Sequence, residues 1–145
     1  MNGHAKKQKT FLRVSGYVEQ LDVHAPGATV AEAVAFSANL RLDAGVAQTQ
    51  RDAFCEQVLA LMELTDIKGK LVGSLTTGGL SFEQRKRLTM AVELASNPAI
   101  LFLDEPTSGL DSRAALVVIR GVRNVAASGR SVICTIHQPA PVPKS

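Results

Sequence analysis

Two adjacent carboxylates, Asp104 and Glu105, directly follow the apolar run 99–103. Such a pair suits a site that hydrolyses a phosphate bond, because the Asp can hold Mg²⁺ while the neighbouring Glu orients and polarises the attacking water. The pair alone does not specify this chemistry, since a solvated loop or a helix cap uses the same residue types.

Three other polar features could take part in the same chemistry. Ser81 begins a predicted helix, where a hydroxyl and free backbone amides can bind an anion, although a simple N-cap is the better interpretation of this residue alone. The turn 108–111, with Ser108 and Asp111 at its ends, could merely cap the helix that follows it. His137 follows an apolar strand, where a histidine is more often a hydrogen-bonding residue than a catalytic one.

The hydrophobic pattern predicts the elements that position these residues. Apolar runs at 99–103 and 131–136 predict two buried strands, and the stretch 112–128 between them predicts a helix that ends before Gly129. This order predicts a parallel α/β sheet, whose ligands bind at the carboxyl ends of the strands. Asp104, Glu105 and His137 all fall at those ends.

The preceding residues predict a strand and three helices. Imperfect alternation over 11–19 predicts a strand that runs into the loop 20–27. Capping boxes at 29–32 and 81–84 predict helices that extend to about 42 and 97, and a further helix is predicted over 49–64. The apolar faces contain Ala33, Phe36, Ser37 and Leu40 in the first helix, Phe54, Val58, Leu61 and Met62 in the second, and Leu88, Ala91, Val92 and Ala95 in the third.

Four motifs appear in order along the chain: GYVEQ at 16–20, LSFEQ at 80–84, LFLDEPTSGLD at 101–111 and TIHQP at 135–139. Together they resemble the nucleotide-binding cassette of ABC transporters, over essentially the whole chain. More narrowly, residues 80–93 and 104–111 look like the second cassette of full-size ABCG transporters of the pleiotropic drug resistance type. The resemblance implies an α/β fold, a partial P-loop-type ABC ATPase domain over 1–145, with an inserted α-helical subdomain at about 22–97 and a parallel sheet core, Walker B to H-loop, at 98–139.

The same resemblance implies roles for individual residues, with ATP and Mg²⁺ as cofactors. Asp104 corresponds to the Walker B magnesium ligand, and Glu105 to the catalytic base. Gln20 corresponds to the Q-loop glutamine, which contacts Mg²⁺ and the attacking water. The other correspondences are His137 to the switch histidine that contacts the γ-phosphate, Ser81 to the signature serine that reaches ATP on the opposing cassette, and Ser108 to Asp111 to the D-loop that faces the partner cassette.

Two departures from the family pattern bear on activity. No Gly-x-x-x-x-Gly-Lys-Ser/Thr phosphate loop occurs in the sequence, and this loop supplies the amides and the lysine that hold the β- and γ-phosphates. We therefore expect the chain, as an internal fragment of a cassette, to be inactive in isolation. The family signature is usually Leu-Ser-Gly-Gly-Gln, but this chain has Phe82 and Glu83 in place of the two glycines. Glycines at these positions allow the backbone to approach phosphate closely.

The expected function is ATP hydrolysis that powers export, at the cytoplasmic face of a membrane, with a second cassette and transmembrane domains as partners. Two alternatives stay open: a non-enzymatic fragment that at most pairs with a partner cassette, and a soluble ABC ATPase of translation or DNA repair. The basic run 85–87 could suggest nucleic acid, but a solvated helix face is the simpler interpretation. We expect no nucleic-acid partner.

Composition excludes several other classes of protein. The 145 residues are 46% hydrophobic and 20% charged, which is typical of a globular domain and not of a disordered chain. A formal charge of +3, five Phe, one Tyr and no Trp argue against a nucleic-acid-binding surface. The longest apolar run covers only 114–119, whereas a membrane-spanning helix needs about 20 residues.

Overall fold

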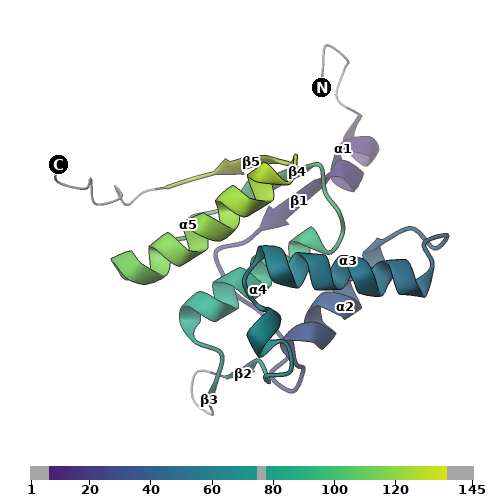
Figure 1. Cartoon of the computed structure of the whole chain (residues 1–145). Helices are drawn as coiled ribbons and strands as arrows, with labels where there is room; N and C mark the ends of the chain where they lie inside the picture. The colour runs from purple at the N-terminus through teal and green to yellow at the C-terminus, as the bar shows by residue number, and fades with distance from the viewer. Residues whose placement is uncertain (1–6, 75–77, 137–145) are drawn as a thin grey trace.

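The computed structural model describes residues 7–74 and 78–136, and a three-stranded parallel sheet is at its centre (Figure 1). The strands β1 (Ser15–Val18), β4 (Ile100–Leu103) and β5 (Ser131–Cys134) lie in the order β1-β4-β5. Val18 pairs with Leu103, and Leu103 pairs with Cys134, so the three strands end at the same level. The predicted parallel α/β class is confirmed, and the carboxyl ends of the strands meet at one edge.

Helices lie against this sheet and beside it. The helix α5 (Ser112–Ala127) connects β4 to β5 and runs along the sheet, whereas α2 (Val30–Arg41), α3 (Gln48–Leu61) and α4 (Phe82–Leu94) group together next to it (Figure 1). The shorter elements are α1 (Gln8–Val14), the 3-10 helix η1 (Thr65–Ile67) and the antiparallel pair β2 (Gly73–Ser74) and β3 (Gly78–Gly79).

Both predicted capping boxes form. Thr29 Oγ1 accepts a hydrogen bond from Glu32 N at 3.2 Å, and Thr29 N donates to Glu32 Oε2 at 2.8 Å. Ser81 and Gln84 make the equivalent pair at the start of α4. In each box two side-chain oxygens accept from two backbone N–H groups that the start of a helix would otherwise leave free, so the side chains fix where α2 and α4 begin.

A hydrophobic core joins the sheet to the helices. Leu101 and Leu103 of β4, Leu88 of α4 and Val118 of α5 are all at most 2% exposed within it. The Met62 methyl group packs against the α5 backbone at Gly121, where a Cβ would lie 2.9 Å from Met62 Cε. The strand that ends at the carboxylate pair and the helix that follows Ser81 therefore share one packed interior.

The strand predicted over residues 11–19 is wrong in its first half. Residues 8–14 form α1, and β1 comprises only 15–18. Phe11 and Val14 are three residues apart, which suits one face of a helix as well as an imperfect strand. In the helix, the Phe11 ring lies 6.1 Å from the Phe102 ring of β4, so an aromatic contact with the sheet accompanies the helical conformation.

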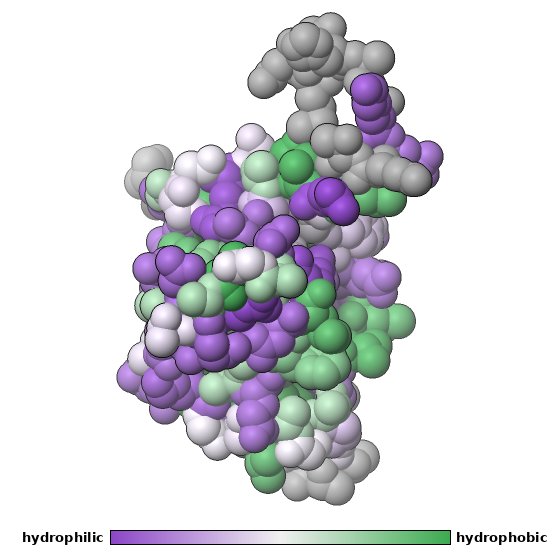
Figure 2. Space-filling view, turned by 90° about the vertical axis from the view of Figure 1, so that its right-hand side faces the viewer, coloured by the Kyte–Doolittle hydropathy of each residue, from purple (hydrophilic) through white to green (hydrophobic). Residues whose placement is uncertain are grey.

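The apolar face predicted for α2 is only half right: Ser37 is buried and Ala33 packs against the core, but the two large side chains lie at the surface. Phe36 and Leu40 are each 68% exposed, whereas Val34 and Ala38, on another side of the helix, are fully buried. The small residues decide the orientation, because Ser37 approaches α4 closely enough for its hydroxyl to donate to Val92 O at 2.7 Å. Figure 2 shows one face of the molecule, on which hydrophobic and hydrophilic side chains are interspersed.

The second strand of the predicted pair is also shorter and more exposed than expected. It ends at Cys134 instead of residue 136, and the side chains of Ile133 and Ile136 are 54% and 51% exposed. Among the described strands β5 has a single neighbour, β4, so it is an edge strand. The exposure of Ile133 shows that one face of β5 is uncovered.

The basic run 85–87 is buried, contrary to the predicted solvated helix face. Arg85, Lys86 and Arg87 are 7%, 2% and 7% exposed. Arg85 Nη2 donates to Val72 O at 2.9 Å, Arg87 Nη1 donates to Met62 O at 2.9 Å, and Lys86 Nζ donates to the Gln20 carbonyl. Because each cation meets a backbone carbonyl of another segment, the run ties α4 to its surroundings.

Candidate active site

The carboxylate pair lies at the carboxyl end of β4, between the ends of β1 and β5. Asp104 N donates to Val18 O at 3.0 Å, which continues the pairing of β4 with β1 by one residue. On the other side, Thr135 N donates to Leu103 O at 3.1 Å. The backbone at the end of β4 is therefore held from both sides, and Glu105 follows where the strand leaves the sheet.

Thr135 connects the two carboxylate residues. Its hydroxyl donates to Asp104 Oδ1 at 2.9 Å and accepts from Glu105 N at 3.0 Å. A hydroxyl has one donor and two lone pairs, so it makes both bonds at once. Sequence reasoning gave Thr135 no role. The available signal was a hydroxyl directly after a strand that runs parallel to the one preceding Asp104.

Gln20 and Tyr17 reach the same carboxylates from the end of β1. Gln20 Nε2 donates to Glu105 Oε2 at 3.3 Å, and Tyr17 OH donates to Asp104 Oδ2 at 3.0 Å. The second bond raises the pKa of the Tyr17 phenol, because the carboxylate holds the phenolic proton. We call Tyr17, Gln20, Asp104, Glu105 and Thr135 the carboxylate cluster. The sequence analysis predicted roles for Gln20, Asp104 and Glu105, but none for Tyr17 or Thr135.

Glu105 has a backbone conformation that is unusual for its residue type. Its φ is +46°, in the left-handed region that costs a residue with a Cβ about 1–2 kcal/mol. The surrounding bonds impose this turn, because Thr135 accepts from Glu105 N and Ser108 N donates to Glu105 O at 3.0 Å. Backbone strain of this kind gathers at functional sites. Here it accompanies the departure of Glu105 from the line of β4.

Ser81 lies at the start of α4, next to β3 in the chain (Figure 1). Its Oγ accepts from Gln84 N at 3.2 Å, so its hydroxyl takes part in the helix cap and not in the hydrogen bonds of the carboxylate cluster described above. The neighbouring Glu83 carboxylate lies 2.6 Å from Arg87 Nε, one turn further along α4. The negative charge that replaces a signature glycine is therefore paired within the helix.

The turn 108–111 follows the carboxylate pair and starts α5. Gly109 has a φ of +73°, and a Cβ on it would lie 3.4 Å from Phe82 Cε1, so the Phe82 ring lies against the turn. Asp111 accepts from Ala114 N at 2.8 Å and is the N-cap of α5. Ser108 is half-buried and bonded through its amide to the Glu105 carbonyl. His137, predicted to lie near the carboxylates, is outside the described residues.

The oxygen atoms of the carboxylate cluster suit a magnesium ion. Mg²⁺ takes one or two carboxylates together with waters and phosphate oxygens. Asp104 would supply a carboxylate, and the Gln20 amide, whose nitrogen donates to Glu105, would supply a neutral oxygen. The chemistry of this donor set fits the ligands that the sequence predicted, Asp104 and Gln20.

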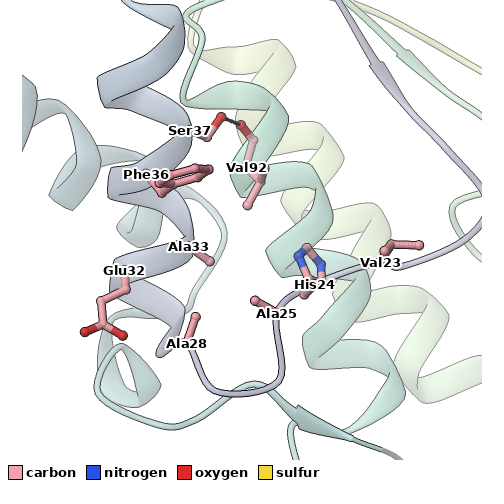
Figure 3. Close-up of a pocket in the computed structure, with 9 residues that line it drawn as sticks. All are labelled: Val23, His24, Ala25, Ala28, Glu32, Ala33, Phe36, Ser37 and Val92. Atoms are coloured by element: carbon pink, nitrogen blue, oxygen red, sulfur yellow. Dashed lines mark hydrogen bonds between the residues drawn. The ribbon is translucent and has the colours of Figure 1, made fainter.

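A pocket of about 470 Å³ lies elsewhere, between α2, α4 and the segment 23–28 (Figure 3). Its lining is mostly apolar and includes Phe36 and Val92, with His24 among the polar residues. His24 Nε2 lies 2.8 Å from Thr89 Oγ1, and burial lowers the pKa of the imidazole. None of the site residues predicted from the sequence lines this pocket. The sequence analysis did not predict a pocket at this place.

The fold and the carboxylate cluster define a class of protein, an α/β domain with an Asp-Glu pair at the carboxyl ends of parallel strands, where nucleotides bind in open sheets. The sequence profile of the ABC transporter family matches residues 1–108. The chain therefore belongs to the ABC transporter family.

Similar proteins place the chain more narrowly. Member 31 of the ABC transporter G family of Arabidopsis thaliana is 57% identical over 140 residues, and member 51 of Oryza sativa subsp. japonica is 56% identical over 140 residues. The pleiotropic drug resistance protein TUR2 of Spirodela polyrhiza is 56% identical over the same length. These relatives confirm the resemblance to the G family.

Each of these alignments covers 97% of the chain and 10% of the relative, so the chain spans about a tenth of the length of the relatives. In the stretches 7–74 and 78–136, no helix combines the length and the apolarity needed to cross a bilayer.

Proposed function

We propose that the chain forms part of the ATP-binding and ATP-hydrolysing cassette of a G-family ABC transporter, in which hydrolysis powers export of a substrate. The observation that carries this proposal is the Asp104–Glu105 pair at the end of β4, with the Gln20 amide 3.3 Å from Glu105, in a member of the ABC transporter family. The second cassette of a full-size transporter is the proposed origin of the segment, because residues 80–93 and 104–111 resemble it.

In this proposal Glu105 is the general base that takes a proton from the attacking water. Gln20 orients the Glu105 carboxylate, and Thr135 holds the Glu105 backbone through its amide. Asp104 and Gln20 would hold Mg²⁺, which would offset the negative charge of the phosphates. His137 is assigned to the γ-phosphate on the family resemblance.

The interface with a second cassette is assigned to Ser81, Ser108 and Asp111. Ser81 is exposed at a helix N-terminus, where its hydroxyl could face ATP held by the partner. The proposed partners are that cassette and the transmembrane domains, at the cytoplasmic face of a membrane. The grouping of α2, α3 and α4 supports residues 22–97 as the helical subdomain.

The isolated chain is proposed to be inactive, because its sequence contains no phosphate loop to capture the nucleotide. The alternative of a soluble ABC ATPase of translation or DNA repair gains no support from the basic run 85–87, because this run is buried against backbone carbonyls.

The test uses a complete transporter, built by replacing the matching segment of the Arabidopsis relative with residues 1–145. Glu105→Gln keeps the side-chain size and an acceptor for Gln20 but removes the base, so ATP hydrolysis should fall about 10²- to 10⁴-fold while nucleotide binding persists. Glu56→Gln, at an exposed carboxylate that pairs with Lys68 on the surface, is the matched control and should leave turnover unchanged. Turnover of Glu105→Gln at the control rate would show that Glu105 is not the base.

A further inference from the structure

The roles assigned above leave the buried ion pair between Lys86 and Asp22 unexplained. Lys86 Nζ lies 3.2 Å from Asp22 Oδ2, and the two side chains are only 3% and 5% exposed. Taking both charges out of water is costly, and an apolar pair of similar volume often stabilises a fold equally well. Stability alone therefore gives a weak reason for two charges at this position.

Lys86 has a second contact, which leads to the carboxylate cluster. Its ammonium group donates to the backbone carbonyl of Gln20, and the side chain of Gln20 donates to Glu105 Oε2 at 3.3 Å. The Lys86 cation is thus connected through Gln20, by two hydrogen bonds, to the carboxylate that is assigned as the base. Gln20 itself is exposed, so packing contributes little to holding it in place.

Asp22 is held by the same face of α4. Its Oδ1 accepts from Thr89 Oγ1 at 2.6 Å, while Oδ2 faces Lys86. Lys86 and Thr89 are three residues apart and therefore neighbours on the helix surface. The segment 20–22 is consequently fastened to α4 at two points, one backbone carbonyl and one carboxylate.

The start of α4 is tied to the same cation. Lys86 Nζ lies 5.8 Å from the centre of the Phe82 ring, within the range of a cation–π contact, and that ring lies against Gly109. Lys86 therefore meets the residue after Ser81 on one side and the segment that carries Gln20 on the other.

We propose that Lys86 and Asp22 are positioning residues for hydrolysis, because their ion pair fixes the backbone at Gln20 and so sets the Gln20 amide against Glu105. The inference rests on the proposed function, since it concerns the same reaction. Neither residue touches nucleotide or water in this assignment, and both act through Gln20.

The first test needs no activity and uses the full 145-residue chain. Backbone order parameters from ¹⁵N relaxation over residues 19–24 are compared among the parent, Lys86→Met, and the double variant Asp22→Asn with Lys86→Met, which leaves no unpaired charge and keeps an acceptor for Thr89. Because both variants lose the bond to the Gln20 carbonyl, the order parameters there should fall from the value of a rigid backbone, about 0.85, toward that of a flexible one, below about 0.6, with α5 unchanged. Order parameters at the parent value over 19–24 in either variant overturn the proposal.

The second test separates positioning from charge neutralisation in the complete transporter. Lys86→Met should lower kcat about tenfold while the KM for ATP stays within about twofold, because the base is misplaced and the nucleotide contacts remain. Lys68→Met, at a surface lysine that is 45% exposed, is the matched control. In the double variant, stability should recover and kcat should not. Recovery of both would mean that Lys86 only neutralises Asp22, and the proposal would be wrong.

Glu105→Gln measured in parallel distinguishes the two levels of failure. If Glu105→Gln abolishes turnover and the Lys86 variants keep it, only the positioning role fails. If Glu105→Gln keeps turnover, the proposed function fails at its catalytic residue, and the positioning role falls with it.

Discussion

Replacing Arg87 with Met should remove the contact between α4 and the end of α3. The Arg87 side chain is 9% exposed, and its Nη1 donates to Met62 O at 2.9 Å and to Glu63 O at 2.7 Å. Both acceptors lie just past the C-terminus of α3, where a helix leaves its last carbonyls without partners of its own. Met has a similar length and no donor, so the substitution deletes these bonds with little change in volume.

The expected loss follows from these contacts. A hydrogen bond from a charged donor contributes about 1.5–3 kcal/mol, and the two bonds here share one nitrogen, so they count for less than twice that value. Removing the guanidinium recovers part of its desolvation cost, but it also leaves the Glu83 carboxylate, which lies 2.6 Å from Arg87 Nε, without this partner. We therefore expect a destabilisation of about 2–3 kcal/mol, which for a chain of this size lowers the melting temperature by roughly 10 °C.

Urea denaturation followed by circular dichroism measures this difference directly. Arg123→Met provides the matched control, because Arg123 is exposed on α5, and its unfolding free energy should change by less than about 0.5 kcal/mol. If Arg87→Met unfolds at the same urea concentration as the control, the reasoning is refuted. The basic run would then behave as the solvated face that the sequence suggested.

Nucleotide affinity, pH dependence and the threonine bridge give three further predictions. In calorimetric titration the isolated chain should not bind MgATP in the micromolar range, and clear micromolar binding would contradict its proposed inactivity. Because burial lowers the pKa of His24, the unfolded chain binds more protons, so stability should fall as the pH drops below about 6.5. His24→Asn should flatten this fall, and identical pH profiles would exclude His24 as its source. Thr135→Val should slow hydrolysis in the complete transporter about tenfold, because it frees Glu105 N and Asp104, and unchanged turnover would remove Thr135 from the site.

The unit from β4 to β5 could be predicted because its elements have distinct local patterns. The apolar run before Asp104 is too short for a helix, and the helix between the strands is bounded by Asp111 and Gly129, each a residue type favoured at its position. The carboxyl end of β4 then follows from the point where the apolar run stops, which is why Asp104 and Glu105 could be located in advance.

The buried side of α2 could not be read from its sequence, because the helix offers two apolar sides. Phe36 and Leu40 form one, and Val34 and Ala38 form the other. The side with Phe36 and Leu40 is more hydrophobic, because its side chains are larger. The smaller side chains on the other side allow α4 to pack closely, and the Ser37 hydroxyl then reaches a backbone carbonyl of α4. Only the tertiary contact with α4 selects between the two sides.

The residues that support the carboxylates escaped prediction for a similar reason. Thr135 lies 31 residues beyond Asp104, and Tyr17 lies 87 residues before it. The local sequence around these residues does not predict the contacts, because the contacts depend on the register in which β1 and β5 pair with β4. Given that register, a hydroxyl one position past β5 is level with Asp104, so the missing information was the strand pairing and not the chemistry of the side chains.

The unusual signature gains a physical explanation from the contacts of its two substituted residues. A carboxylate close to a γ-phosphate is electrostatically unfavourable, but Glu83 lies 2.6 Å from Arg87 Nε, and this pairing reduces its field at the exposed start of α4. Phe82 places its ring between Lys86 and the turn that follows Glu105. Two glycines at these positions would allow closer backbone approach to phosphate but would remove both contacts. The substitutions therefore exchange access at the helix start for a fixed connection among the start of α4, the turn 108–111 and the cation that holds Gln20.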